Sequence, residues 1–89
     1  MNFSNVKISD VKTDIGILVK KMRTTQKLSQ EELAKKLNLS RITIQNIENG
    51  KNFTIDTYLL IFQYFDEIGS FSEYIKSRND DVHDITSLY

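Results

Sequence analysis

Hydrophobic residues recur at helical rather than strand-like spacing from residue 13 onward. Four of them fall at i, i+3, i+4 and i+7 and predict one face of a first helix: Ile15, Leu18, Val19 and Met22. Thr13 is a suitable N-cap for this helix. Glycine costs about 1 kcal/mol relative to alanine inside a helix, so Gly16 is interpreted as permitting a close contact with another helix.

Two short helices follow, each with its own start and stop signals. In residues 28–38, which read LSQEELAKKLN, Ser29 and Glu32 form a capping box, and Asn38 can adopt the left-handed conformation that ends a helix. Ser40 caps the next helix, which ends with Gly50 in the C′ position. Only Asn38 and Leu39 separate the end of the earlier of these two helices from Ser40, the cap of the later one. The two helices must therefore cross steeply, as in a helix-turn-helix.

Residues 54–68 predict a fourth helix, capped by Thr54, that is apolar on two faces and therefore needs two partners. One face is expected to cover the domain's own core: Ile55, Leu59, Phe62 and Phe65. The other is expected to form a dimer interface with a second copy: Leu60, Ile61, Tyr64 and Ile68, with Phe71 and Tyr74 as neighbours.

The two ends of the chain are less regular. Gly69 is expected to end the fourth helix, and Ser70 with Glu73 to cap a short last helix over residues 70–77. Residues 79–89 form an acidic tail that either folds back on its own domain or anchors a protein partner. The sequence therefore divides into an N-terminal arm (1–12), a helix-turn-helix domain (13–68), and a short helix with a tail (69–89).

Charge is unevenly distributed although the net charge is zero. Residues 1–53 hold ten Lys and Arg against five Asp and Glu, a net of +5, and residues 54–89 hold two against seven, a net of −5. A basic half of this kind indicates a face that binds a polyanion, and the acidic half indicates a region with another use.

Composition excludes several classes of function. The chain has no cysteine and a single histidine, His83, so disulfides, thiolate metal sites and histidine clusters are ruled out. It has no long apolar run and no signal pattern, so we expect a soluble cytoplasmic protein. A Gly-rich phosphate loop is absent, and the paired carboxylates are adjacent rather than facing each other. We therefore expect no enzyme, no catalytic or metal site, and no cofactor.

The chain resembles the XRE-like, phage Cro/repressor-type helix-turn-helix family over about residues 13–68. Nine positions agree in type and spacing: Arg23, Gln30, Leu33, Ala34, Ser40, Ile44, Ile47, Glu48 and Gly50. The resemblance implies a compact all-α, five-helix domain, here with a short extra C-terminal helix and tail. It also implies that a homodimer binds double-stranded DNA, with the second helix of the motif in the major groove.

Site residues follow from this placement. The outward face of residues 41–49 is expected to contact bases: Arg41, Ile42, Thr43, Gln45 and Asn46. The resemblance implies phosphate contacts for Ser29, Gln30, Ser40, Asn49, Lys51 and Asn52, and an internal ion pair between Arg23 and Glu48. The family often has glycine where Lys27 stands and glutamine where Arg41 stands, so the turn and the preferred base are expected to differ.

Two functions remain open. Ile15-Gly16 and the segment 54–59 look most like HipB-type antitoxins, which implies an autoregulating repressor that also masks a co-encoded toxin. The alternative is a stand-alone phage or restriction-modification regulator without a toxin partner. Both are sequence-specific repressors that bind a palindromic operator as dimers, and the neighbouring open reading frame would separate them.

Overall fold

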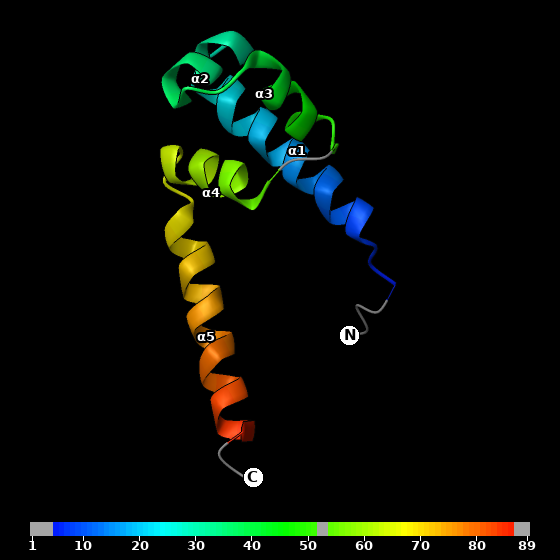
Figure 1. Ribbon diagram of the computed structural model, residues 1–89, viewed down its shortest axis with the longest axis vertical. Helices are drawn as coiled ribbons and strands as arrows, with labels where there is room; N and C mark the ends of the chain where they lie inside the picture. The colour runs from blue at the N-terminus through cyan, green and yellow to red at the C-terminus, as the bar shows by residue number, and fades with distance from the viewer. Residues whose placement is uncertain (1–4, 52–53, 87–89) are drawn as a thin grey trace.

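The computed structural model describes residues 5–51 and 54–86, the side chains of residues 83–86 excepted. Within these residues the chain forms five helices and no strand, which confirms the predicted all-α fold. The helices are α1 (Ile8–Thr25), α2 (Gln30–Leu37), α3 (Arg41–Glu48), α4 (Ile55–Tyr64) and α5 (Ile68–Thr86). Helices α1, α2 and α3 pack together, α4 lies beneath them, and α5 runs away from α4 (Figure 1).

The hydrophobic core lies where the first four helices meet. Its buried apolar residues come from all of them: Val19, Leu33, Ala34, Ile44, Ile47, Ile61 and Phe62. The predicted inner face of the first helix is largely confirmed, because Val19 is fully buried while Ile15 and Met22 pack against the core. Leu18 is the exception, since 39% of its surface remains exposed.

Three predicted N-caps are confirmed. The hydroxyl oxygens of Ser29, Ser40 and Thr54 each accept a hydrogen bond from the backbone N–H three residues ahead. In the first case Glu32 completes the capping box, because its Oε1 accepts a hydrogen bond of 2.9 Å from the Ser29 N–H. These bonds fix where α2, α3 and α4 begin, and hence the two helices of the motif.

Four of the described residues take the left-handed backbone conformation where helices end or turn. Asn38 (φ 56°) and Gly50 (φ 69°) do so as predicted after α2 and α3. Lys27 (φ 58°) takes up the conformation that glycine adopts at least cost. Asp66 (φ 62°) was not predicted and marks the corner between α4 and α5.

The predicted start of the first helix is wrong. Helix α1 begins at Ile8, and Lys7 occupies the N-cap position, where its backbone N–H donates a 3.1 Å hydrogen bond to Asp10 Oδ2. Thr13 lies inside the helix, and its hydroxyl donates to the carbonyl of Ser9. Residues 8–12 of the segment expected to be an arm therefore belong to α1, while residues 1–4 lie outside the described part of the chain.

The prediction for the C-terminal region is also wrong in its boundaries. Helix α4 ends at Tyr64, and Gly69, Ser70 and Glu73 lie inside α5 instead of ending one helix and capping another. Helix α5 has 19 residues and includes most of the expected loose tail; residues 87–89 lie outside the described chain. Because α5 projects, the molecule extends 51 Å along its longest axis. Its radius of gyration is 15.7 Å, against about 12 Å for a globular chain of this length.

The division of α4 into a core face and a dimer face needs two corrections. Ile61, expected at the dimer interface, is fully buried in the core of its own domain and has no surface left for a second copy. Ile55, expected in the core, is 64% exposed. The reason is that α4 docks through Ile61 and Phe62 together, so its buried face is rotated from the expected one.

Candidate nucleic-acid interface

The turn between α2 and α3 sets the geometry of the motif. Asn38 reverses the chain in the left-handed conformation, and the Leu39 N–H donates a 2.8 Å hydrogen bond to the carbonyl of Ala34. Ser40 then caps α3 directly. Both the turn and the start of α3 are therefore fixed by backbone hydrogen bonds, and α3 has one orientation relative to α2 (Figure 1).

Helix α3 has an anchored face and an outward face, as predicted. Ile44 and Ile47 are fully buried, and Ile42 is 62% exposed. Arg41 and Gln45 are also exposed, and within the described chain no hydrogen bond engages their side chains. The outward side thus offers a guanidinium, an amide and a branched apolar group, the chemistry that reads base edges in a major groove.

Two predicted base-contact residues are less free than the others. Thr43 is half-buried, and its hydroxyl shares a 2.8 Å hydrogen bond with the hydroxyl of Ser40. Asn46 is also half-buried, at the inner border of the exposed face. A contact from either residue must therefore come at the edge of the surface centred on Arg41, Ile42 and Gln45.

The C-terminal end of α3 lies directly against α1, which explains Gly16. A Cβ atom on Gly16 would come 2.6 Å from the carbonyl oxygen of Ile47 and 2.5 Å from that of Glu48. Gly50 makes a second close approach, because a Cβ there would lie 3.2 Å from Cα of Thr13. The predicted close helix contact at Gly16 is confirmed, and it sets how closely the end of α3 approaches α1.

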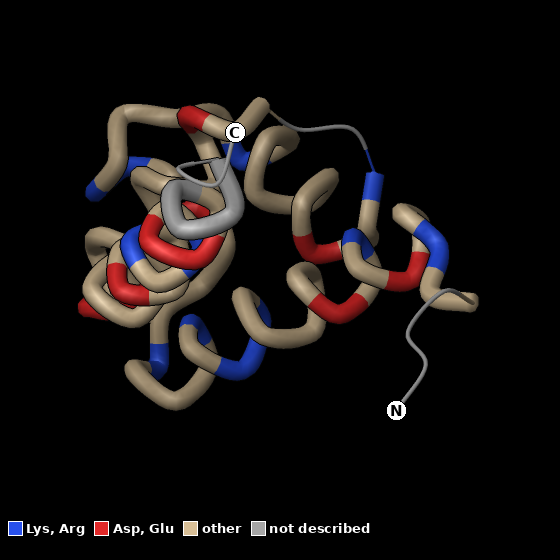
Figure 2. The backbone as a smooth tube through the Cα atoms, turned by 90° about the horizontal axis from the view of Figure 1, so that it is seen from below, with Lys and Arg blue, Asp and Glu red and all other residues tan. Residues whose placement is uncertain are grey.

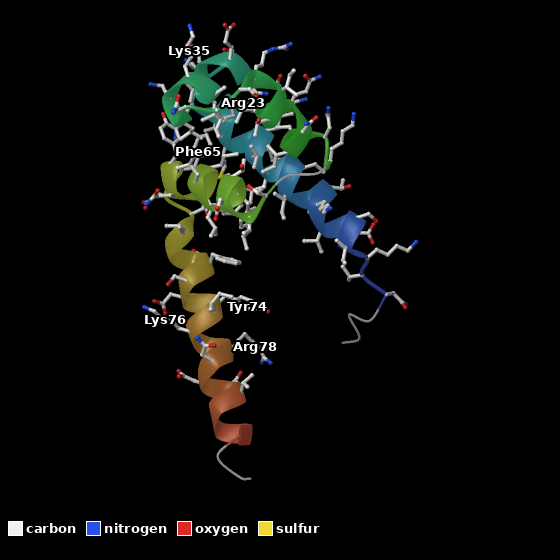
Figure 3. All side chains as sticks on the ribbon, in the orientation of Figure 1. Arg23, Lys35, Phe65, Tyr74, Lys76 and Arg78 are labelled. Atoms are coloured by element: carbon white, nitrogen blue, oxygen red, sulfur yellow. The ribbon has the colours of Figure 1, made fainter. Side chains whose placement is uncertain are left out.

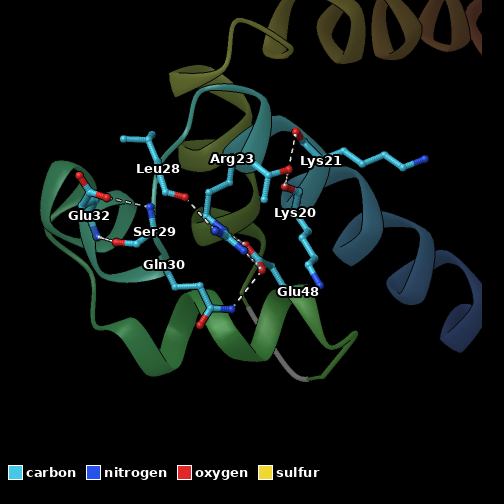
Figure 4. Close-up of polar contacts among 9 residues, drawn as sticks. Lys20, Lys21, Arg23, Leu28, Ser29, Gln30, Glu32 and Glu48 are labelled. Atoms are coloured by element: carbon cyan, nitrogen blue, oxygen red, sulfur yellow. Dashed lines mark hydrogen bonds and ion pairs between the residues drawn. The ribbon is translucent and has the colours of Figure 1, made fainter.

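A buried ion pair between Arg23 and Glu48 joins α1 to the end of α3 (Figure 4). Arg23 Nε lies 2.6 Å from Glu48 Oε2, and Arg23 Nη2 lies 2.9 Å from Glu48 Oε1. The third guanidinium nitrogen, Nη1, donates to the carbonyl of Leu28 at 2.8 Å. The hydrogen bonds to Glu48 raise the pKa of Arg23 above its usual value. The guanidinium therefore stays charged and holds α1, α3 and the start of α2 together.

Gln30 joins this network, which the sequence did not predict. Its Nε2 donates a 3.1 Å hydrogen bond to Glu48 Oε1, the oxygen that also accepts from Arg23 (Figure 4). The side chain expected to contact phosphate is thus already held by Glu48 of α3. No sequence signal pointed to this bond, because the two residues are 18 positions apart and both were explained separately.

The other expected phosphate contacts lie at helix ends. Ser29 and Ser40 stand at the N-termini of α2 and α3, where free backbone N–H groups favour an anion, although their hydroxyls already accept capping bonds. Asn49 and Lys51 are exposed just after α3. Asn52 lies outside the described residues.

Charge follows the same division as the fold. The basic half of the sequence forms α1, α2 and α3, whereas α4 and α5 belong to the acidic half. Figure 2 views α5 nearly end on and shows residues of both signs along it. The surface that carries the motif is therefore the more favourable one for a phosphate backbone.

Comparison with known proteins agrees with this geometry. The family model for helix-turn-helix proteins of the XRE type matches residues 19–68, which include α2, α3, α4 and the buried ion pair. No curated protein matches the chain. No helix in the described residues has the length and apolar character to cross a membrane. The chain belongs to the XRE-type helix-turn-helix family of DNA-binding transcription regulators.

Proposed function

We propose that the protein is a sequence-specific repressor that binds a palindromic operator as a homodimer. The outward face of α3 carries this proposal, because Arg41, Ile42 and Gln45 are exposed on a helix whose opposite side is fully buried. In this mode α3 enters the major groove, and the N-termini of α2 and α3 face phosphates. Two copies would read half-sites about one helical turn apart.

The finer proposal is an autoregulating antitoxin of a HipBA-like system, with a stand-alone phage or restriction-modification regulator as the alternative. Support for the antitoxin comes from Ile15-Gly16 and residues 54–59 of the sequence. The structure gives a further reason for glycine at position 16, because the carbonyl oxygens of Ile47 and Glu48 lie where a side chain would stand. Coexpression with the neighbouring open reading frame decides between the two: a stable complex supports the antitoxin, and separate elution of both proteins supports the stand-alone regulator.

Binding to the protein's own promoter tests the repressor. A labelled promoter duplex and a scrambled duplex of equal length are titrated at about 150 mM salt, because nonspecific affinity falls steeply with salt. We expect the promoter to bind at least about 1,000-fold more tightly than the scrambled duplex. Equal affinities would overturn the proposal of sequence-specific repression.

A further inference from the structure

The side of α3 that carries Arg41 and Gln45 ends at Glu48. These three residues are four and three positions apart, so they lie on one side of the helix. Arg41 and Gln45 are exposed, whereas the side chain of Glu48 is only 3% exposed, because Arg23 and Gln30 contact its carboxylate. The network of Arg23, Glu48 and Gln30 therefore forms one border of the outward face of α3.

Lys20 lies on α1 beside this border. It follows Gly16, whose backbone lies against the carbonyl of Glu48, by four residues, and it precedes Arg23 by three. Residues at these spacings share one side of a helix, so Lys20 lies on the side of α1 that faces the end of α3. In Figure 4 its side chain extends toward α3, whereas the neighbouring Lys21 points away.

The ammonium group of Lys20 is available to another molecule. The residue is exposed, and among the side chains that the structure describes none forms a hydrogen bond or an ion pair with this ammonium. The carboxylate of Glu48 is already paired with the guanidinium of Arg23, so it leaves no charge for Lys20 to neutralise. Within the described chain, Lys20 therefore adds an unpaired positive charge to the border of the outward face.

Cations from the acidic half of the chain cannot take this place. Lys76 and Arg78 are the only Lys and Arg of residues 54–89, and both belong to α5. Helix α5 runs away from the body, so both side chains lie far from α3 (Figure 3). Arg78 is also paired with Asp81 at 3.1 Å. A positive charge beside α3 must therefore come from the basic half.

We propose that Lys20 binds a phosphate of the DNA strand that borders the major groove entered by α3. The inference rests on the proposed function, because it adds a contact from α1 to those expected from the helix-turn-helix. A lysine ammonium binds phosphate as a point charge, so the contact adds affinity without selecting a base. Since Gly16 and Arg23 hold α1 against α3, a phosphate bound by Lys20 also restricts how α3 can turn in the groove.

The salt dependence of DNA binding tests the contact. The full chain is titrated with the promoter duplex and with the scrambled duplex between about 50 and 200 mM salt. Lys20→Ala should weaken binding to both duplexes by about 5-fold at about 150 mM salt. It should also reduce the slope of log K against log salt by about 0.9, the value for one phosphate contact on duplex DNA. Lys20→Arg keeps the charge and should recover most of the loss.

Lys21→Ala is the matched control, because it removes the same charge from an exposed neighbour that points away from α3. This variant should keep the wild-type slope. Thermal unfolding followed by circular dichroism checks that each variant is folded. A wild-type slope for Lys20→Ala, or an equal reduction for Lys21→Ala, would overturn the inference.

Neutral phosphate analogues locate the contact. Single methylphosphonate linkages are placed in turn along the promoter duplex, and the wild type and Lys20→Ala are titrated with each duplex. We expect at least one linkage that weakens binding of the wild type and leaves binding of Lys20→Ala unchanged. The same loss for both proteins at every linkage would show that Lys20 binds no phosphate.

The phosphate contact and the proposed function fail separately. If Lys20→Ala reduces the slope but the wild type binds both duplexes equally, the contact from α1 stands and specific repression is overturned. If the wild type prefers its promoter but Lys20→Ala keeps the wild-type slope, the repressor stands and the contact from α1 is overturned.

Discussion

The backbone of Gly16 lies against the carbonyl of Glu48, so that α1 and the end of α3 touch without a side chain between them. The same two segments are joined by the ion pair between Arg23 and Glu48. Helix α3 is thus held at its C-terminal end by contacts that leave its N-terminal outward face unused.

Replacing Gly16 with alanine should destabilise the fold. The added Cβ would meet two backbone carbonyls that belong to a capped helix and have little room to move, and overpacking of this kind costs about 1–3 kcal/mol. Urea unfolding measures the loss. Gly69→Ala is the control, because a Cβ at that position meets no atom within 4 Å. Equal stability of the two variants would contradict the close contact.

Glu48→Gln should destabilise the protein by about 3–5 kcal/mol, because it leaves the guanidinium of Arg23 buried without a counter-charge. The two side chains are only 10% and 3% exposed, for Arg23 and Glu48 respectively. Thermal unfolding provides the measurement, with Glu31→Gln on the exposed side of α2 as control. If the Glu48→Gln protein had the same melting temperature as the Glu31→Gln control, the ion pair would contribute little to stability.

Substitutions on the two faces of α3 should affect stability and DNA binding separately. Ile44→Ala removes a fully buried side chain and should cost about 2–5 kcal/mol of stability. Ile42→Ala removes a side chain that is 62% exposed and should leave the melting temperature nearly unchanged while weakening operator binding. Calorimetry and a promoter titration check the pair; a large loss of stability in Ile42→Ala would contradict the assigned faces.

Arg41 and Lys51 should act differently on DNA. Arg41→Ala should cost about 1–3 kcal/mol of specific binding and relax the preference at one base pair. Lys51→Ala should weaken binding to all sequences alike and reduce the dependence of affinity on salt. Titrations of the promoter and its single-base variants at several salt concentrations separate these effects. The same profile for both variants would mean that the base-reading surface lies elsewhere.

The contribution of Glu32 to the stability of the fold should depend on pH, and the direction follows from its pKa. Hydrogen bonds from the backbone and hydroxyl of Ser29 lower the pKa of its carboxyl below the usual value of 4.5. The folded state then binds fewer protons than the unfolded state, so the stabilising effect is complete above the unfolded-state pKa and is lost as pH falls through the folded-state pKa. The difference in melting temperature between wild type and Glu32→Gln should therefore shrink below about pH 4.5. A constant difference would contradict this cause.

The sequence predicted best where local chemistry decides the structure. The caps at Ser29, Ser40 and Thr54 and the turns at Asn38 and Gly50 need only neighbouring residues, and all five were found. The caps predicted at Thr13 and at Ser70 were wrong, because both residues lie inside longer helices. The buried pair Ile44 and Ile47 followed from spacing alone.

Predictions that depend on distant packing were less accurate. Ile61 was assigned to the wrong face of α4 because four apolar residues in a row give no unique helical face. The corner at Asp66 was missed because aspartate in a left-handed turn leaves a weaker signal than the nearby Gly69. The bond between Gln30 and Glu48 depends on how α2 and α3 cross, which spacing along the chain does not specify.

The contact at Gly16 also constrains how new binding preferences could be engineered or evolve. The close contact at Gly16 holds the end of α3 against α1. Under the proposed binding mode, a different operator would therefore be read by exchanging the side chains at positions 41, 42 and 45. Those side chains have no hydrogen bonds to the rest of the described protein, so each exchange leaves the scaffold unchanged. Substitutions at these three positions can therefore change which operator is bound while the fold stays the same.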